Sequence, residues 1–328
     1  MALTKVAYLL GAGATHAEVL NLEEAPSALF ISNNGLLISD VSKRVMKIAQ
    51  KNSRFKKNVE EVTFREGPIN IELLISLLES NQIPDSDFKV THLKRLIQKD
   101  IRGKLSKSRR KKFYLHKALL ELHSLTSERE SLLGIISLNY DNLLDDAYEK
   151  IHDKRHNYCL TYEKGDGIPL LKLHGSFSWT NVSTYGKPKN ISIIPLGINK
   201  NYLVPPYNFI WSRAFEILAQ CDILRVIGCS LNQNDIGLVD LLFKAHLARR
   251  EAFEIEIIDF QQTGDEIKRR YGFFRKILSL EEIEPPLVAG IPTDVGNPFK
   301  EWLAAKGKKM LGDDIDRTKF LRRCCESG

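Results

Sequence analysis

The chain has 328 residues, of which 43% are hydrophobic and 27% are charged, and its formal net charge is +7. This composition excludes an extended disordered chain, and the length allows one large domain or two ordinary ones. No apolar run approaches the roughly 20 residues needed to cross a bilayer, so no membrane association is expected. The five cysteines include no C-x-x-C pair, so neither a disulfide framework nor a zinc ribbon is predicted, and we expect a cytoplasmic protein.

The N-terminal residues are typical of a strand, a glycine loop and the start of a helix. Residues 4–10 are apolar and β-prone, and Gly11-Ala12-Gly13-Ala14-Thr15 follows them directly. Such glycines let the backbone turn tightly, so that amide groups at the helix N-terminus can approach a pyrophosphate. Close packing of the strand on the helix explains such a loop roughly as often. His16 replaces the third glycine of the dehydrogenase pattern, so hydride transfer is not expected.

The rest of the chain shows helical and strand patterns in turn. Apolar residues at helical spacing predict a helical insertion over about 36–130. Further strands are expected at 132–138, 170–173, 223–227 and 253–259, and further helices ending at Lys150 and over 209–220 and 236–249. This alternation predicts an α/β fold, a Rossmann-like and mostly parallel sheet flanked by helices. We expect one catalytic domain over 1–260 and a C-terminal extension over 261–328.

Polar residues stand where the expected strands end. Asn139 and Asp141 follow the second strand, and His174 follows the third. Because parallel strands end at the same edge of a sheet, we expect these residues to converge with the glycine loop at the edge where ligands gather. Gly228-Cys229-Ser230 and Asp259 mark a fourth and a fifth strand end. Structural roles compete with functional ones: a helix N-cap explains Asp141 about equally well, and a lone histidine is usually structural.

The ordered set of motifs resembles the sirtuin family over about residues 5–260. It consists of Gly11-Ala12-Gly13-Ala14-Thr15, Leu138-Asn139-Tyr140-Asp141, Lys172-Leu173-His174-Gly175-Ser176 and Gly228-Cys229-Ser230-Leu231. The second and third motifs are more similar to the prokaryotic antiphage branch than to the protein deacetylases. Sirtuin deacetylases carry a four-cysteine zinc module after the His-Gly motif, whereas residues 175–220 contain no cysteine. The segment 16–21 also departs from the Gly-Ile-Pro-Asp-Phe-Arg segment of the deacetylases.

This resemblance implies an NAD+ hydrolase that releases nicotinamide and ADP-ribose and requires no metal. Asn139 would orient the nicotinamide ribose and the attacking water, and His174 would act as general base. The dinucleotide would be bound by Gly11, Ala12, Gly13 and Thr15 at the pyrophosphate, Asp141 on the nicotinamide side, Gly228 and Ser230 towards the adenylate half, and Asp259 at the adenosine ribose.

In the family, such hydrolases act in defence by depleting cellular NAD+, an abortive response, often under the control of a partner. The resemblance therefore implies a homo-oligomer and a defence partner, such as a HerA-type DNA-translocase ATPase or an Argonaute-like protein. The insertion 36–130 and the extension 261–328 are the segments where we expect these contacts. A basic run between Lys104 and Lys112 leaves direct nucleic-acid contact open, although no aromatic residues are interleaved through it.

Two other functions fit the same motifs. A sirtuin-type deacylase or ADP-ribosyl transferase would use the same pocket, and the missing cysteines count against the deacylase. A sensing module would bind NAD+ or ADP-ribose without turnover. The presence of both Asn139 and His174 favours turnover.

Overall fold

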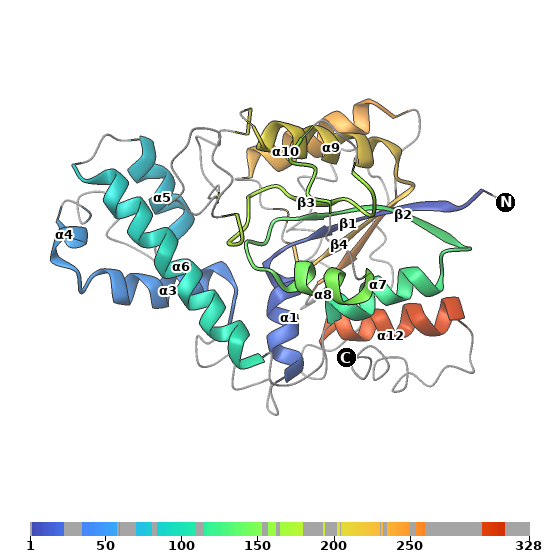
Figure 1. Ribbon diagram of the computed structural model, residues 1–328, viewed down its shortest axis with the longest axis horizontal. Helices are drawn as coiled ribbons and strands as arrows, with labels where there is room; N and C mark the ends of the chain where they lie inside the picture. The colour runs from blue at the N-terminus through green and yellow to red at the C-terminus, as the bar shows by residue number, and fades with distance from the viewer. Residues whose placement is uncertain are drawn as a thin grey trace, which may run out of the picture.

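The protein is built around a parallel β-sheet with helices on both faces (Figure 1). The computed structural model describes residues 2–22, 35–57, 59, 70–80, 84–108, 115–152, 157–161, 165–179, 193, 202–203, 205–229, 231, 235–249, 254–259 and 297–311. Within them the sheet has five strands, which are β1 (Thr4–Leu10), β2 (Glu130–Ser137), β3 (Leu170–Lys172), β4 (Ile223–Ile227) and β5 (Glu254–Ile258).

The strands lie in the order β3-β2-β1-β4-β5, and every neighbouring pair is parallel. This is the order of a Rossmann fold, in which the chain reverses direction across the sheet between β1 and β4. The predicted fold class is therefore confirmed. The near-continuous apolar sequence of β1 follows from burial on both faces, because Val6, Tyr8 and Leu10 enter one core and Ala7 and Leu9 enter the other.

Two layers of helices cover the sheet. One face packs against α9 (Tyr207–Gln220) and α10 (Ile236–Leu247). The other face packs against α1 (Ala12–Leu22), α7 (Leu115–Leu125), α8 (Leu143–His152) and α12 (Pro298–Leu311). No helix within the described part of the chain is both long enough and apolar enough to cross a membrane.

The helical insertion forms a core of its own beside the sheet. It comprises α3 (Ile38–Ala49), α4 (Ser53–Lys56), α5 (Ile71–Ser80) and α6 (Ser86–Ser108). These helices extend away from the sheet, and α7 does not join them (Figure 1). Instead, α7 packs on the sheet, where Leu119 and Leu122 are buried with Tyr8. Helical spacing identifies a helix but not its packing partner, so the separate helical unit is shorter than the expected insertion 36–130.

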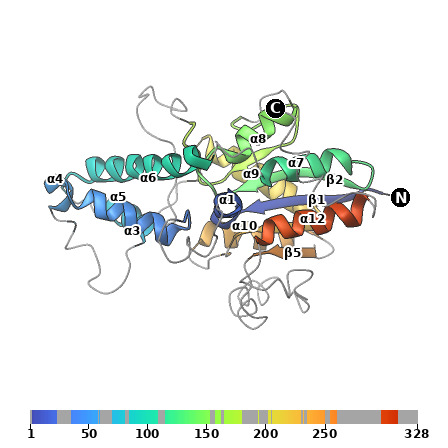
Figure 2. The ribbon, with the colours of Figure 1, turned by 90° about the horizontal axis from the view of Figure 1, so that it is seen from below.

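The C-terminal helix α12 also belongs to the sheet layers. It lies beside α7 along the sheet (Figure 2), and Trp302 and Leu303 are buried in the same core. The indole Nε1 of Trp302 donates to Glu256 at 3.0 Å, and Lys306 lies 3.2 Å from Glu130. These contacts join part of the expected C-terminal extension to the sheet, because the apolar face of α12 packs into the core that covers it.

A fully buried arginine connects four strands. Arg225 on β4 donates to both carboxylate oxygens of Glu130 on β2 and to Glu256 on β5, each at 2.7 Å. It also donates to the hydroxyl of Tyr8 on β1 at 2.9 Å. A buried charge is costly unless it is paired and hydrogen-bonded, and here each neighbouring strand supplies a partner.

Candidate functional site

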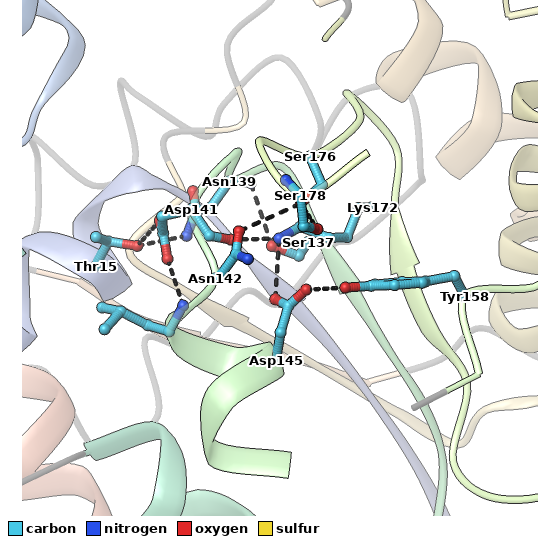
Figure 3. Close-up of polar contacts among 11 residues, drawn as sticks. Thr15, Ser137, Asn139, Asp141, Asn142, Asp145, Tyr158, Lys172, Ser176 and Ser178 are labelled. Atoms are coloured by element: carbon cyan, nitrogen blue, oxygen red, sulfur yellow. Dashed lines mark hydrogen bonds and ion pairs between the residues drawn. The ribbon is translucent and has the colours of Figure 1, made fainter. Parts of the chain in front are cut away.

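The sequence motifs meet at the carboxyl edge of the sheet, where β1, β2, β3 and β4 end. The backbone amide of Leu138 donates to Leu10 at 2.9 Å, and that of Leu173 donates to Ser137 at 3.0 Å. The turns that follow β1, β2 and β3 therefore start side by side. The expected convergence of the strand ends is present in the structure (Figure 3).

The glycine loop after β1 packs directly against the turn after β4. A Cβ atom on Gly11 would lie 2.5 Å from the carbonyl oxygen of Gly228, and one on Gly13 would lie 2.6 Å from its Cα. Gly228 itself has a φ of +56°, and a Cβ there would lie 2.2 Å from the nitrogen of Ala14. The amide of Gly11 donates to Ile227 at 3.0 Å and that of Gly13 donates to Gly228 at 2.8 Å. Close packing therefore accounts for both glycines, and their amides donate within the protein.

The side chain of Asn139 is fixed against this loop. Its Nδ2 donates to the carbonyl oxygen of Gly11 at 2.8 Å and to the hydroxyl of Thr15 at 3.0 Å. The Thr15 hydroxyl in turn donates to Asp141 Oδ2 at 2.7 Å. Figure 3 shows this chain of contacts between α1 and the turn after β2. Because Nδ2 donates to the loop, the carboxamide of Asn139 is held in one orientation. In this orientation Oδ1 is the atom of the side chain that can accept a hydrogen bond.

Asp141 connects the start of α8 to the start of α1. Its Oδ1 accepts from the amide of Leu143 at 3.0 Å, at the start of α8. Its Oδ2 accepts from Thr15, as described above. Asp141 therefore accepts from the first amide of α8 as an Asx turn does, from one residue before the N-cap position that was predicted for it, and the same carboxylate also accepts from Thr15, which contacts Asn139.

A buried lysine joins the second and third motifs. Lys172 is 1% exposed, and its Nζ donates to the backbone carbonyl of Asp141 and pairs with Asp145 at 3.0 Å. Tyr158 donates to the other oxygen of Asp145, and burial together with the Asp145 charge raises the pKa of Tyr158. Sequence reasoning did not single out Asp145 or Tyr158. The sequence pattern that could have identified Asp145 is an acidic residue one helical turn after Asp141.

His174 lies beside a buried carboxylate that sequence reasoning missed. Its Nε2 lies 3.2 Å from Oδ2 of Asp235, and both side chains are 2% exposed. Asp235 caps α10 by accepting from the amide of Leu238 at 3.4 Å. An Asp directly before an apolar helical pattern predicts an N-cap at Asp235, but no local sequence pattern predicts that Asp235 contacts His174.

The helical insertion reaches the same site. The hydroxyl of Tyr140 donates to Glu72 on α5 at 2.8 Å, and its ring lies 6.4 Å from that of His174. Burial and the charges of Glu72 and Asp235 raise the pKa of Tyr140 well above its usual value. On α6, Gln98 donates to the carbonyl oxygen of Phe177 at 3.2 Å. The insertion thus contacts both the Asn-Tyr-Asp turn and the segment after His174.

The remaining predicted residues lie towards β5 or outside the described residues. Asp259 directly follows β5 and is partly exposed, and Ser230 lies outside the described residues. Cys229 is buried between the two strand ends. Burial, with smaller contributions from Asp235 and Asp259, raises the pKa of the Cys229 thiol to about 12. Asp259 therefore lies near the turn after β4, on the far side of that turn from the contacts around Asn139.

Two further features do not coincide with the motifs. A cavity of about 320 Å³ lies near the amino ends of β2 and β3, and its walls include Leu133, Cys159, Pro169 and Arg213. No motif residue lines it. Within the described residues, no three His, Cys, Asp or Glu side chains are grouped as metal ligands would be.

Comparisons with known proteins found similarity only to solved structures. No family model and no curated protein matches the sequence. A structure of Sir2 bound to acetylated peptide is 12% identical, with 84% of this chain and 92% of that chain covered and a TM-score of 0.39. A structure of Sir2 with p53 peptide and NAD+ is 14% identical, with the same coverage and a TM-score of 0.36. The Rossmann-like fold is therefore assigned from the strand order of this chain and not from these similarities.

Proposed function

We propose that this chain hydrolyses NAD+ at the bond between nicotinamide and ribose. The observation that carries the proposal is the placement of Asn139 and His174. They follow two neighbouring strands at the carboxyl edge of a Rossmann-like sheet. Nδ2 of Asn139 donates to the buried Thr15, and Nε2 of His174 lies 3.2 Å from the buried carboxylate of Asp235. The sirtuin-like order of the motifs supports NAD+ as the substrate.

The proposed reaction needs a positioned water and a base. The C1′–N bond breaks with both electrons passing to the nicotinamide nitrogen, which becomes neutral and leaves without needing an acid. The water oxygen forms the new bond to C1′, and its proton passes to His174. Asn139 donates to the glycine loop through Nδ2, so its Oδ1 is the atom assigned to orient the water or a ribose hydroxyl. The products are nicotinamide, ADP-ribose and one proton.

The dinucleotide would lie across the strand ends. The start of α1 offers the positive end of a helix dipole to the pyrophosphate, and Ala12 at this position is exposed. Gly11 and Gly13 would keep this helix start close to the turn at Gly228. Asp141 on the nicotinamide side, Ser230 at the adenylate half and Asp259 at the adenosine ribose complete the proposed site.

The proposed role is that of a defence effector that depletes cytoplasmic NAD+. Such an activity must be inhibited until it is needed. The helical insertion contacts Tyr140 and Phe177, so a change in the position of the insertion would alter the site and could inhibit or activate the hydrolysis. We propose that the chain acts as a homo-oligomer with a partner such as a HerA-type ATPase or an Argonaute-like protein. No metal enters the proposed mechanism.

The test is NAD+ consumption and nicotinamide release by the purified full chain, alone and co-expressed with a genomic neighbour. Asn139→Ala and His174→Ala should each lower turnover by at least about 100-fold. The matched control is His246→Ala, which replaces a half-buried histidine near the end of α10 and should keep full activity. Tight NAD+ binding without turnover under every condition would instead establish a sensor, and release of acyl groups from acyl-lysine peptides would establish a deacylase.

A further inference from the structure

A cavity of about 320 Å³ lies at the amino ends of β2 and β3, opposite the end of the sheet that carries the candidate site. The different lengths of the two strands explain its position. β3 pairs with the last three residues of β2, from Ile135 to Ser137, so on that side Leu132 and Leu133 have no strand neighbour within the described residues. Both leucines line the cavity, and from Leu133 to Ser137 the strand rises by roughly 13 Å. The cavity is therefore separate from the turns that carry the motifs.

A second wall of the cavity is one face of α9. The residues that line it recur at helical spacing, and they are Phe209, Ser212, Arg213 and Glu216. The other face of α9, which includes Ile210, Ala214 and Ile217, is buried in the core against the sheet. The cavity thus has apolar walls from the start of β2 and from Phe209, and polar groups on the helix beside them.

The charged groups of the cavity neutralise each other. Among the described residues that line it, only Arg213 and Glu216 carry charge, and Nη1 of Arg213 donates to Oε2 of Glu216 at 2.5 Å. A guanidinium has five N–H groups and a carboxylate has two oxygens, so this pair offers donors and an acceptor side by side. The two side chains are 27% and 45% exposed, and a partly solvated pair of this kind rearranges at little cost.

We propose that this cavity binds an uncharged heteroaromatic ring that carries an N–H donor beside an acceptor, the pattern on the edge of a nucleobase. The ring packs against Phe209 and the apolar start of β2, as bases pack on aromatic and apolar side chains in other proteins. Its acceptor takes an N–H of Arg213, and its own N–H donates to Glu216. The volume is at the lower end of the range for small-molecule sites, which suits a base with one sugar.

The absence of a net charge on the described walls predicts selectivity against phosphate. A phosphate group adds a charge of about −2 close to the carboxylate of Glu216, so a nucleotide should bind less tightly than its nucleoside. At the candidate site the order would be reversed, because the start of α1 favours a phosphate. The order of the two affinities therefore distinguishes the two places.

Calorimetric titration of the purified full chain with inosine tests the proposal. Inosine should bind with a Kd in the range of about 10 µM to 1 mM. 1-Methylinosine lacks the N–H donor and should bind at least about tenfold less tightly, and inosine 5′-phosphate should also bind less tightly than inosine. No binding of inosine at about 10 mM would overturn the proposal, and so would equal affinities for inosine and 1-methylinosine.

Variants on α9 locate the bound ring. Ser212→Trp places a large side chain in the cavity and should abolish binding, whereas Gln220→Trp, at an exposed position of the same helix that does not line the cavity, should not. Arg213→Met should weaken binding by about tenfold or more, because one hydrogen bond to a charged group is lost. Inosine binding that is unchanged in Ser212→Trp would show that the ring lies elsewhere.

A measurement on the unaltered protein remains decisive even where a variant fails to fold. Cys159 lines the cavity and is 8% exposed, and burial raises the pKa of its thiol, so its alkylation by iodoacetamide is followed at alkaline pH by mass spectrometry. Inosine should slow the alkylation of Cys159, and 1-methylinosine at the same concentration should not. An unchanged rate at saturating inosine would overturn the proposal. Neither measurement needs turnover, so both outcomes are independent of the proposed hydrolysis.

Discussion

The Nδ2 atom of Asn139 donates to the carbonyl oxygen of Gly11 at 2.8 Å, which ties the turn after β2 to the glycine loop after β1. The same nitrogen donates to Thr15. Asn139, which is assigned to catalysis, therefore also connects the turns that follow β1 and β2. Its substitution should affect both activity and stability.

Asn139→Asp is expected to abolish turnover and to remove the two hydrogen bonds that Nδ2 donates to Gly11 and Thr15. The new carboxylate would face the carbonyl oxygen of Gly11, so we expect a loss of about 1–3 kcal/mol in the free energy of unfolding. Nicotinamide release and urea unfolding measure the two effects. Asn142→Asp is the neighbouring control, because the Asn142 side chain accepts a long hydrogen bond from Ser176, at 3.5 Å, which a carboxylate can still accept. Equal losses in both variants would contradict the assignment.

Gly13→Ala should destabilise the protein, whereas Gly103→Ala should not. The added methyl group at Gly13 would lie 2.6 Å from the Cα of Gly228, and at Gly103 on α6 nothing lies within 4 Å. Overpacking against backbone typically costs about 1–3 kcal/mol, while an exposed helical glycine gains about 0.5–1 kcal/mol on replacement by alanine. Thermal unfolding of the two variants should shift in opposite directions. A stable Gly13→Ala protein would show that the two turns are not packed as described.

Lys172→Met should destabilise the protein strongly because it leaves Asp145 buried without its cation. Removing one partner of a buried pair costs about 3–5 kcal/mol. Replacing both partners with apolar residues, as in Lys172→Met with Asp145→Leu, should recover part of this loss. The exposed pair of Lys244 and Asp240 provides the control, and Lys244→Met should leave the free energy of unfolding nearly unchanged. A loss at Lys172 as small as that at Lys244 would argue against a buried pair.

Acidification should destabilise the protein through the buried His123. Its Nε2 shares a hydrogen bond of 2.5 Å with the hydroxyl of Tyr8, which also accepts from Arg225. Burial and the Arg225 charge lower the pKa of His123 from 6.5 to about 4. The unfolded chain then binds more protons between pH 6.5 and 4, so stability falls as the pH falls through this window, by on the order of 3 kcal/mol.

His123→Gln isolates this contribution. Glutamine can still share a hydrogen bond with Tyr8 but does not titrate, so the free energy of unfolding should depend less on pH between 6.5 and 4 than in the wild type. Chemical unfolding at several pH values measures the difference. His246→Gln near the end of α10 should leave the pH dependence of the wild type intact. If His123→Gln kept the full pH dependence, another group would have to be responsible.

Local sequence patterns were enough to predict the sheet. The first strand was expected at 4–10 and the fourth at 223–227, and β1 and β4 occupy those residues. Each is a short apolar run followed by glycine, which stops the strand and starts a turn. The same patterns could not place α7 or α12, because an amphipathic helix shows that one face is buried but not against what.

The edge that carries the candidate site follows from the sequence alone, because the order of strands and helices forces parallel strands to end together and each motif directly follows a strand. The partners at that edge do not. Asp235 reaches His174 from the cap of α10, and Glu72 reaches Tyr140 from an insertion 68 residues earlier in the chain. Such contacts depend on how separate layers pack, and no local periodicity records which side chains meet across them.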